Sequence, residues 1–264
     1  MKVVLFCGGL GTRLRDLSGE VPKPMVKIGY RPILWHVMRY YAHYGHKDFV
    51  LCLGYRADVI KQFFLTYEEW ISNDFTLSSG GKHIELENND IADWNITFVD
   101  SGLHANIGQR LLAVRRYVEN EEMFLANYAD GLTDLHLPDM IRRFRESGKV
   151  GSFLAAPPSQ SFHLVELDDD EEVTAIRPVA DTNLLINGGY FAFRRELFDY
   201  IEPGEELVEE PFGRLIKERQ LLGYRHDRLW VMDTFKEQQL LSDMYTSGQA
   251  PWEVWNRVLA AQGS

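Results

Sequence analysis

The residues best suited to chemistry lie near the start of the chain, in a glycine-rich loop that follows an apolar run at residues 3–7. Backbone N–H groups approach phosphate oxygens only where no side chain blocks them, and Arg and Lys neutralise phosphate charge. A strand followed by a glycine-rich loop and then by separated basic residues therefore predicts a phosphate-binding loop. Its candidate residues are Gly8, Gly9, Gly11, Thr12, Arg13 and Lys23.

Two common glycine motifs do not fit this loop. The P-loop requires a Gly-Lys pair, which is missing here, and the dinucleotide fingerprint requires a third glycine where Leu14 stands. A glycine turn with solvated cations is the plain alternative. Pro22 and Pro24 argue against it, because they restrict the backbone on both sides of Lys23.

Two aspartates are candidates for binding a divalent cation, which often needs only one or two carboxylates beside phosphate and water. Asp130 follows an expected strand at residues 123–128, and ligands collect at the carboxyl ends of strands in α/β sheets. Asp233 follows an apolar stretch and precedes an expected helix. Taken alone, it is better explained as a helix N-cap, a role that Thr234 could also fill. The nearby Asp134 is expected in a surface turn.

The hydrophobic pattern predicts the elements that position these residues. Apolar runs at 3–7 and 49–54 predict buried strands, and a helix from Pro32 to Tyr44 between them completes a parallel strand–helix–strand unit. Residues 66–94 lack a regular hydrophobic periodicity and are interpreted as an insertion. The alternation predicts an α/β fold, a mostly parallel open sheet with flanking helices and an antiparallel region at its edge. Further helices are expected at 57–64, 107–118, 138–146, 209–220 and 234–246, and further strands at 96–99, 123–128, 151–156, 164–167, 173–177 and 187–193.

Composition limits the partners of the chain. Its 264 residues, 45% of them hydrophobic, can form one substantial core. The net charge of −11 argues against nucleic acid as a partner, because a nucleic-acid binder shows a basic face. The two cysteines lie in apolar runs and fit a reduced, cytoplasmic setting. No apolar stretch is long enough to predict a membrane span, so no membrane partner is expected.

Several segments together resemble a known family. The pattern GGLGTRL…PKPM resembles that of sugar-1-phosphate nucleotidyltransferases. The stretches RPILWHVMRYYAHYGHKDFVLCLGY, VDSG, NYADGLTD, LINGGYF, VMDT and SGQAPWEVW are similar to those of glucose-1-phosphate cytidylyltransferases in particular. The PILWH and APWxVW parts are more specific than the glycine loop, which the whole superfamily shares.

The resemblance implies a Rossmann-like nucleotidyltransferase core and a reaction of CTP with a sugar 1-phosphate that gives a CDP-sugar and pyrophosphate. It implies Mg²⁺ as cofactor, with Asp130 and Asp233 as its ligands, and Arg13 and Lys23 as catalytic residues. In this hypothesis a phosphate oxygen of the sugar 1-phosphate attacks the α-phosphorus in line. The loop and Arg13 hold the departing pyrophosphate, and Lys23 neutralises charge around the α-phosphate. UTP or dTTP in place of CTP stays an alternative.

The resemblance also indicates where the base binds. Base choice is expected from polar groups around Gly54, Ser101 and Arg110. The family's Gly-Gly-Arg-Leu stretch reads Gly-Gln-Arg-Leu here at residues 108–111. Two interpretations of Arg110 stay open: it faces the cytosine carbonyl, or it is an exposed residue on the first turn of a helix.

The residues expected at the sugar phosphate depart further from the family. His163 stands where the family has a glycine, and Ile176-Arg177 where it has Glu-Lys, while Asn187 and Gly188 are retained. Isoleucine accepts no hydrogen bond from a sugar hydroxyl, whereas Arg177 can engage a phosphate with two. Glucose 1-phosphate or a related sugar phosphate stays the first expectation for the acceptor. The alternative that these departures favour is a modified sugar phosphate or another phosphorylated small molecule.

The same resemblance implies the domain organisation of the whole chain. One nucleotidyltransferase domain over residues 1–264 is expected, with 1–150 mainly for the nucleotide and 151–264 mainly for the sugar phosphate and the C-terminal helices. The resemblance implies a homo-oligomer, and the aromatic tail at residues 251–255 is a candidate interface. A catalytically silent regulatory domain is the competing class. The presence of the loop cations and of both aspartates argues against it.

Overall fold

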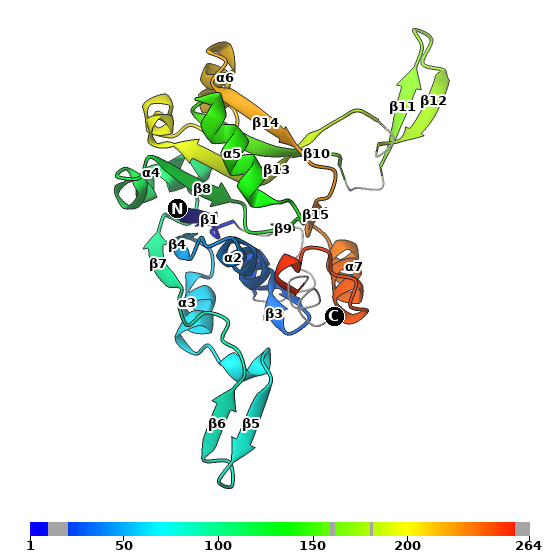
Figure 1. Cartoon of the computed structure of the whole chain (residues 1–264). Coiled ribbons are helices and arrows are strands. Elements are labelled where there is room, and N and C mark those ends of the chain that lie inside the picture. Colours follow the sequence, from blue (N-terminus) through cyan, green and yellow to red (C-terminus); the bar gives the residue numbers. More distant parts are fainter. Residues whose placement is uncertain (10–20, 159–161, 180–181, 257–264) are drawn as a thin grey trace.

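A mixed sheet forms the centre of the protein (Figure 1). The computed structural model describes residues 1–9, 21–158, 162–179 and 182–256. Gly11, Thr12 and Arg13 therefore lie outside the described residues. Within the described part the sheet has seven strands in the order β14–β10–β13–β8–β1–β4–β7. Their bounds are β1 (Lys2–Phe6), β4 (Asp48–Leu53), β7 (Asn95–Asp100), β8 (Met123–Asn127), β10 (Gly151–Ala156), β13 (Ile186–Arg194) and β14 (Leu221–Arg225).

The pairing confirms the α/β fold with a mostly parallel sheet. Strand β1 pairs in parallel with β4 and β8, β4 pairs in parallel with β7, and β10 pairs in parallel with β14. Only β13 runs antiparallel among the described strands of this sheet, and it lies inside, between β8 and β10. The sequence analysis predicted the antiparallel region at the edge of the sheet, but the edge strand β14 runs parallel to its neighbour β10. Strand β14 occupies that edge because the chain returns there after helix α6.

Helices cover both faces of the sheet. Their bounds are α2 (Ile33–His43), α3 (Ala57–Leu65), α4 (Ile107–Val118), α5 (Leu137–Ser147), α6 (Glu210–Lys217) and α7 (Phe235–Thr246), and a 3₁₀ segment, η5, spans Arg195–Tyr200. Helices α2, α3 and α5 bury their apolar residues in one cluster, and α4, η5 and α6 do so in another. In the part of the chain that the structure describes, no helix combines the length and the apolar character needed to cross a membrane.

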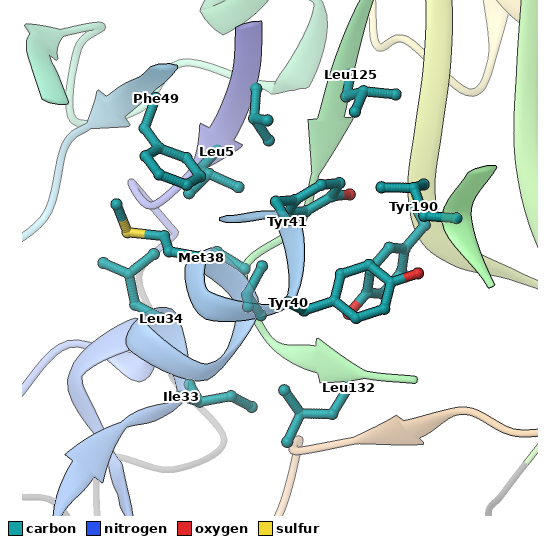
Figure 2. Packing of buried hydrophobic residues seen from close by; sticks show 14 of the residues in the cluster. Leu5, Ile33, Leu34, Met38, Tyr40, Tyr41, Phe49, Leu125, Leu132 and Tyr190 are labelled. Carbon is teal, nitrogen blue, oxygen red and sulfur yellow. The ribbon is translucent and has the colours of Figure 1, made fainter. Parts of the chain in front are cut away.

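Strand β1 shows how the sequence produces this layered core. Successive side chains of a strand point to opposite faces, and every β1 residue from Val3 to Phe6 is apolar. Val3 and Leu5 contribute to the cluster under α2, whereas Val4 and Phe6 contribute to the cluster under α4. Figure 2 shows the first cluster, where Leu5 and Phe49 of the sheet face Leu34 and Met38 of α2. A continuous apolar run is thus a strand buried on both faces.

Four small two-stranded sheets lie outside the central one in the described chain. They are β2–β3 (Lys27–Ile28, Arg31–Pro32), β5–β6 (Phe75–Ser78, His83–Leu86), β9–β15 (Gly131–Leu132, Trp230–Val231) and β11–β12 (His163–Leu167, Val173–Pro178). Figure 1 shows the β5–β6 and β11–β12 hairpins projecting from the body in different directions. The β5–β6 hairpin belongs to the expected insertion at residues 66–94.

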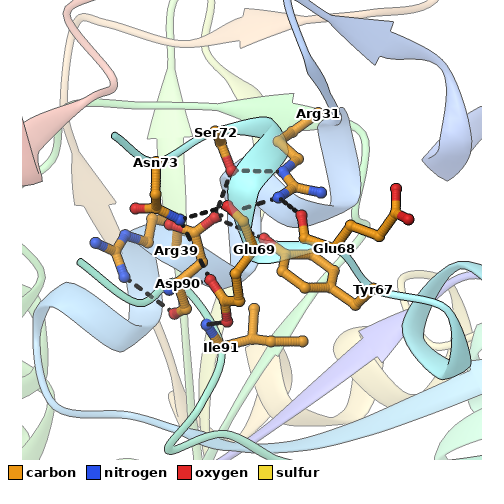
Figure 3. A network of polar contacts seen from close by, with 9 residues as sticks. All are labelled: Arg31, Arg39, Tyr67, Glu68, Glu69, Ser72, Asn73, Asp90 and Ile91. Carbon is orange, nitrogen blue, oxygen red and sulfur yellow. Dashed lines mark hydrogen bonds and ion pairs between the residues drawn. The ribbon is translucent and has the colours of Figure 1, made fainter. Parts of the chain in front are cut away.

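A buried polar network anchors this insertion to the body (Figure 3). The carboxylate of Asp90 accepts hydrogen bonds from the hydroxyls of Tyr67, at 2.7 Å, and Ser72, at 2.5 Å. Arg31, which is 3% exposed, lies 3.5 Å from the same carboxylate and donates to the backbone oxygen of Glu68. Because these partners come from both sides of the insertion and from β3, directly before α2, the base of the insertion is fixed to the core although its tip projects.

Candidate active site

Lys23, Asp130 and Asp233 converge on one point of the structure. Nζ of Lys23 lies 2.6 Å from Oδ2 of Asp130 and also donates to Oδ1 of Asp233. The three side chains are 16%, 26% and 28% exposed, so the group lies at the surface of the core and is open on one side. Residues far apart in the chain thus form one charged cluster with two carboxylates around one cation.

Each member of this cluster has a defined backbone position. Lys23 begins a single 3₁₀ turn, η2 (Lys23–Met25), in which Pro24 and Met25 are buried, and Pro22 holds extended backbone before it. The two prolines fix the direction from which the lysine approaches, as the sequence predicts.

The β9–β15 ribbon brings the two aspartates together. Gly131 pairs with Val231 in antiparallel register, and the backbone N–H of Met232 donates to the carbonyl of Asp130 at 2.9 Å. Ala129, directly before Asp130, has a φ of 62°, a conformation that costs free energy for a residue other than glycine. Its N–H donates to Oδ1 of Asn127 at 2.7 Å, which holds the turn. Strained backbone of this kind is typical of functional sites.

The geometry of the α7 N-cap decides whether Asp233 or Thr234 caps this helix. Thr234 is the N-cap: its hydroxyl accepts from the N–H of Glu237, and Glu237 accepts from the N–H of Thr234. The interpretation of Asp233 as the cap is therefore wrong. Its carboxylate is directed to Lys23, and only its backbone N–H takes part in the cap, by donating to Glu237.

The electrostatics of the cluster keep the lysine charged. Burial disfavours the ammonium of Lys23, but the charges of Asp130 and Asp233 outweigh that effect and raise the pKa of Lys23 above its usual value. Burial, together with the neighbouring charge of Asp233, raises the pKa of Asp130, although Lys23 opposes the shift. Two carboxylates this close repel each other unless a cation lies between them.

This arrangement fits a divalent cation. In the described residues no group of three or more His, Cys, Asp or Glu side chains forms a metal site. Two carboxylates suffice for Mg²⁺ when phosphates and water complete its shell. The ammonium of Lys23 already occupies the space between Asp130 and Asp233, so the pair is preorganised around a positive charge.

Arg110 lies at the carboxyl ends of three parallel strands. It is 3% exposed, so the interpretation of Arg110 as an exposed helix residue is wrong. Its guanidinium donates to the carbonyl of Gly8 at 3.0 Å, to that of Leu53 at 3.3 Å and to the hydroxyl of Ser101 at 2.7 Å. Arg110 therefore ties the ends of β1, β4 and β7 together beside the glycine loop.

The absence of side chains at Gly8 and Gly54 makes room for this arginine. A Cβ on Gly8 would overlap the guanidinium of Arg110. A Cβ on Gly54 would lie 2.9 Å from the carbonyl oxygen of Gly8 and 3.0 Å from that of Gly102. By contrast, among the described residues nothing lies within 4 Å of a Cβ placed on Gly9, which is exposed. Gly8 and Gly54 thus have no room for a side chain, and Gly9 leaves its backbone open toward solvent.

Asn187 and Gly188 lie next to the segment that carries Asp130. The amide of Asn187 donates to the hydroxyl of Tyr128 at 3.2 Å, and the N–H of Tyr128 donates to the carbonyl of Gly189. A Cβ on Gly188 would lie 2.8 Å from the side chain of Leu154, so close packing of β13 against β10 requires glycine there. The structure thus brings Asn187 to the same side of the sheet as the aspartate turn.

His163 and Arg177 lie on the β11–β12 hairpin, which projects from the body (Figure 1). Arg177 is exposed and forms an ion pair with Glu166 of the same hairpin. The structure does not bring these two residues together with Lys23. Their binding to the acceptor phosphate stays a prediction.

The expectation for Asp134 is wrong. The side chain of Asp134 is 5% exposed and bonds to His226 and Arg228, each at 2.8 Å, so it is not a surface-turn carboxylate. These two partners lower its pKa, although burial acts in the opposite direction. Trp252 of the aromatic tail is buried in the core of its own chain. The tail thus contributes to the fold of its own chain, while Trp255 is only partly buried, and the role of residues 251–255 as an interface stays a prediction.

The sequence analysis missed Asn127 and Tyr128 as supports of the site. Asn127 is buried and holds the turn before Asp130, and Tyr128 bonds to Asn187. Their signal is an Asn-Tyr pair at the end of an apolar strand, where polar residues in a buried position indicate a defined hydrogen-bonding role.

Comparison with known proteins identifies the family. The family model described as nucleotidyl transferase matches residues 2–234. The glucose-1-phosphate cytidylyltransferase of Salmonella typhi is 35% identical over 257 residues, which cover 97% of this chain and 100% of that protein. The chain belongs to the nucleotidyl transferase family. A probable glucose-1-phosphate cytidylyltransferase of Bacillus subtilis is 34% identical, covering 97% of this chain and 100% of that protein.

Solved structures agree with the family fold. A UDP-glucose pyrophosphorylase complexed with UDP-glucose has a TM-score of 0.69, covers 94% of this chain and 98% of that chain, and is 14% identical. At this identity the likeness concerns the fold alone. This nucleotidyl transferase therefore has the same arrangement of sheet and helices with few residues in common.

Proposed function

We propose that this protein is a sugar-1-phosphate cytidylyltransferase, which joins a sugar 1-phosphate to CTP and releases pyrophosphate. The observation that carries the proposal is the convergence of Lys23 with Asp130 and Asp233. A cation held between two carboxylates at the edge of a nucleotide-binding sheet suits the joining of two anions. Full-length similarity to enzymes named as glucose-1-phosphate cytidylyltransferases supports CTP as the nucleotide.

The residues of this chain act mainly by position and charge. Lys23 is held protonated by its neighbours and neutralises charge at the α-phosphate. The open backbone at Gly9 contributes N–H groups to the triphosphate. Gly11, Thr12 and Arg13 are proposed to continue this contact along the departing pyrophosphate. Because the acceptor phosphate is already ionised at neutral pH, no protein nucleophile is required.

Asp130 and Asp233 would hold Mg²⁺, which supplies positive charge to the phosphate oxygens of both substrates when it is bound. Lys23 must then leave the space between the two carboxylates. Its ammonium is directed to the substrate phosphates in exchange. The two aspartates thus keep Lys23 in place before the substrates bind.

Arg110 and Ser101 are proposed to form the base end of the nucleotide site. Two carbonyls and the hydroxyl of Ser101 account for three of the five N–H donors of Arg110. Its other two N–H donors form no hydrogen bond to the described residues, and in this proposal they serve an acceptor such as the carbonyl of a pyrimidine. Asn187 and Gly188, beside the aspartate turn, are proposed to contact the acceptor sugar phosphate.

The test is a substrate matrix. The purified protein with Mg²⁺ is incubated with CTP, UTP, dTTP, GTP or ATP against a panel of sugar 1-phosphates, and pyrophosphate release is measured. We expect turnover with CTP and at least one acceptor, at kcat/KM of about 10⁴ M⁻¹s⁻¹ or more. Asp130→Asn serves as the matched inactive control. Tight nucleotide binding without pyrophosphate from any pair would contradict the proposal and favour a regulatory domain.

The same matrix tests the acceptor. Glucose 1-phosphate is expected to be about ten- to a hundredfold poorer than the best acceptor, on the scale of one unpaired buried polar group. Efficient use of glucose 1-phosphate by the wild type would show that the replacement of the family's glutamate by Ile176 does not alter acceptor choice.

A further inference from the structure

The β11–β12 hairpin, residues 163–178, has one apolar face and one mixed face that carries an ion pair beside Leu164. Val165 pairs with Ile176, and Leu167 pairs with Val173, so these four side chains share one face. Their exposed fractions are 53%, 61%, 56% and 58%. The ion pair of Glu166 and Arg177 lies on the other face. This hairpin, the β11–β12 arm, therefore presents an apolar face to solvent.

The β5–β6 hairpin, residues 75–86, repeats this design. Phe75 pairs with Leu86, and Leu77 pairs with Ile84, which places four apolar side chains on one face. Phe75, Leu77 and Ile84 are 40%, 57% and 48% exposed. The opposite face is polar, with Thr76, Ser78, His83 and Glu85. This second hairpin is the β5–β6 arm.

Neither arm can cover the other within one chain, because they project in different directions from separate parts of the body (Figure 1). A two-stranded hairpin is marginal in water by itself and becomes stable when an apolar face packs against another element. Exposed apolar patches of this kind mark interaction surfaces. The apolar face of each arm therefore requires a partner outside its own chain.

The charges at the arm tips indicate which surfaces meet. The tip of the β11–β12 arm is an unbroken acidic run, Asp168 to Glu172, and all of its residues are exposed. The tip of the β5–β6 arm carries the exposed Lys82 and His83. Two β11–β12 arms side by side would bring like charges together, which disfavours that pairing. The acidic tip of a β11–β12 arm is instead attracted by the Lys82 side chain at the tip of a β5–β6 arm.

We propose that the β11–β12 arm of one copy of this chain packs against the β5–β6 arm of a second copy, apolar face to apolar face. The acidic tip then lies near Lys82, and four apolar side chains from each arm close the contact. The contact is head-to-tail, so copies assemble into a closed dimer or ring in which every arm is covered. Ile176 thereby serves assembly, which accounts for an apolar residue at this position.

The test uses one charge substitution in each arm. Ile176→Asp places a carboxylate on the apolar face of the β11–β12 arm, and Leu77→Asp does so on the β5–β6 arm. We expect the wild type to sediment as an oligomer and each variant to self-associate at least about a hundredfold more weakly, because an unpaired charge is costly to bury. Leu164→Asp and Thr76→Asp, on the opposite faces, are the matched controls and should assemble as the wild type does.

Mixing the two variants gives the decisive measurement. A chain with Ile176→Asp keeps an intact β5–β6 arm, and a chain with Leu77→Asp keeps an intact β11–β12 arm. Head-to-tail contact therefore predicts that the mixture forms a heterodimer through one intact pair, seen by sedimentation velocity with one variant labelled by a fluorophore. Unchanged far-ultraviolet circular dichroism spectra show that both variants are folded.

Three results would overturn the proposal. The first is a monomeric wild type at the concentrations used. The second is a Leu77→Asp variant that assembles normally while Ile176→Asp dissociates, which would mean that the β11–β12 arm pairs with itself or with another surface. The third is a mixture that stays monomeric although both single variants are folded. Pyrophosphate release is not part of this readout, so the outcome is independent of the proposed catalytic function.

Discussion

Nζ of Lys23 lies 2.6 Å from Oδ2 of Asp130, although the two residues are 107 positions apart in the chain. The same ammonium reaches Asp233, 210 positions away. The lysine thus serves as the counter-ion of a carboxylate pair. The first two predictions depend on this relationship.

Asp130→Asn and Asp233→Asn should each reduce turnover by about 10²-fold or more, because an amide is a poor ligand for a hard cation. The fold should survive, since both side chains are partly exposed. Pyrophosphate release and the melting temperature are the measurements. Thr234→Ala is the matched control: loss of the α7 cap should cost about 1 kcal/mol of unfolding free energy while the rate is retained. Full activity in Asp233→Asn would remove it from the metal pair.

Lys23→Met should separate two roles of the lysine. Turnover should fall by about 10²-fold through loss of the cation at the α-phosphate. In the absence of nucleotide, however, Mn²⁺ should bind about tenfold more tightly or better, because the competing ammonium is gone. Mn²⁺ affinity is measured by electron paramagnetic resonance. An unchanged or weaker affinity would mean that the metal does not bind between Asp130 and Asp233 in the free protein.

Arg110→Ala should destabilise the protein by about 2–4 kcal/mol and weaken CTP binding. It leaves the carbonyls of Gly8 and Leu53 without their buried donor and removes the link between three strand ends. Urea unfolding and calorimetry measure the two effects. Arg115→Ala, an exposed change on the same helix, should alter stability by less than about 0.5 kcal/mol. Equal effects of the two variants would contradict the role of Arg110 as a link.

Gly54→Ala should weaken CTP binding and lower the melting temperature, since its Cβ would crowd the carbonyls of Gly8 and Gly102. Gly213→Ala, in helix α6 with open space at its Cβ, is the control and should be neutral or stabilising by up to about 1 kcal/mol. Calorimetric titration with CTP compares the two. Unchanged affinity in Gly54→Ala would show that the end of β4 does not shape the nucleotide site.

His36 should make stability fall at acidic pH. It is 1% exposed, its Nε2 lies 3.0 Å from the carbonyl of Ile28, and burial lowers its pKa to about 4. Because the folded pKa is below the unfolded value of about 6.5, the contribution is full above pH 6.5 and is lost as the pH falls toward 4. Between pH 7.5 and pH 5 the loss should be about 2 kcal/mol. His36→Gln can still donate to Ile28 and should lose less over this range in urea unfolding. An identical pH slope in both proteins would show that His36 is not responsible.

The sequence by itself determined the elements and most of their bounds. The expected helix at 107–118 and strand at 151–156 coincide with α4 and β10, because alternation and helical periodicity are local properties of the chain. The apolar run of β1 indicated a strand buried on both faces. The sequence also identified Lys23 and Asp130 as candidates, since a charged residue between two prolines or directly after a buried strand is unusual. The metal-binding role of Asp233 was implied by the resemblance to the family.

Only the tertiary structure decided which of these residues meet and in what role. Both Asp233 and Thr234 were candidates for the α7 N-cap, and only the directions of their side chains show that Thr234 is the cap. Arg110 is buried because of the way α4 lies over the strand ends, which the sequence pattern does not give. The internal place of β13 depends on strand order, which local periodicity does not encode. The two arms illustrate the same limit: each strand pattern is visible in the sequence, but whether an apolar face is covered depends on what lies opposite it in space.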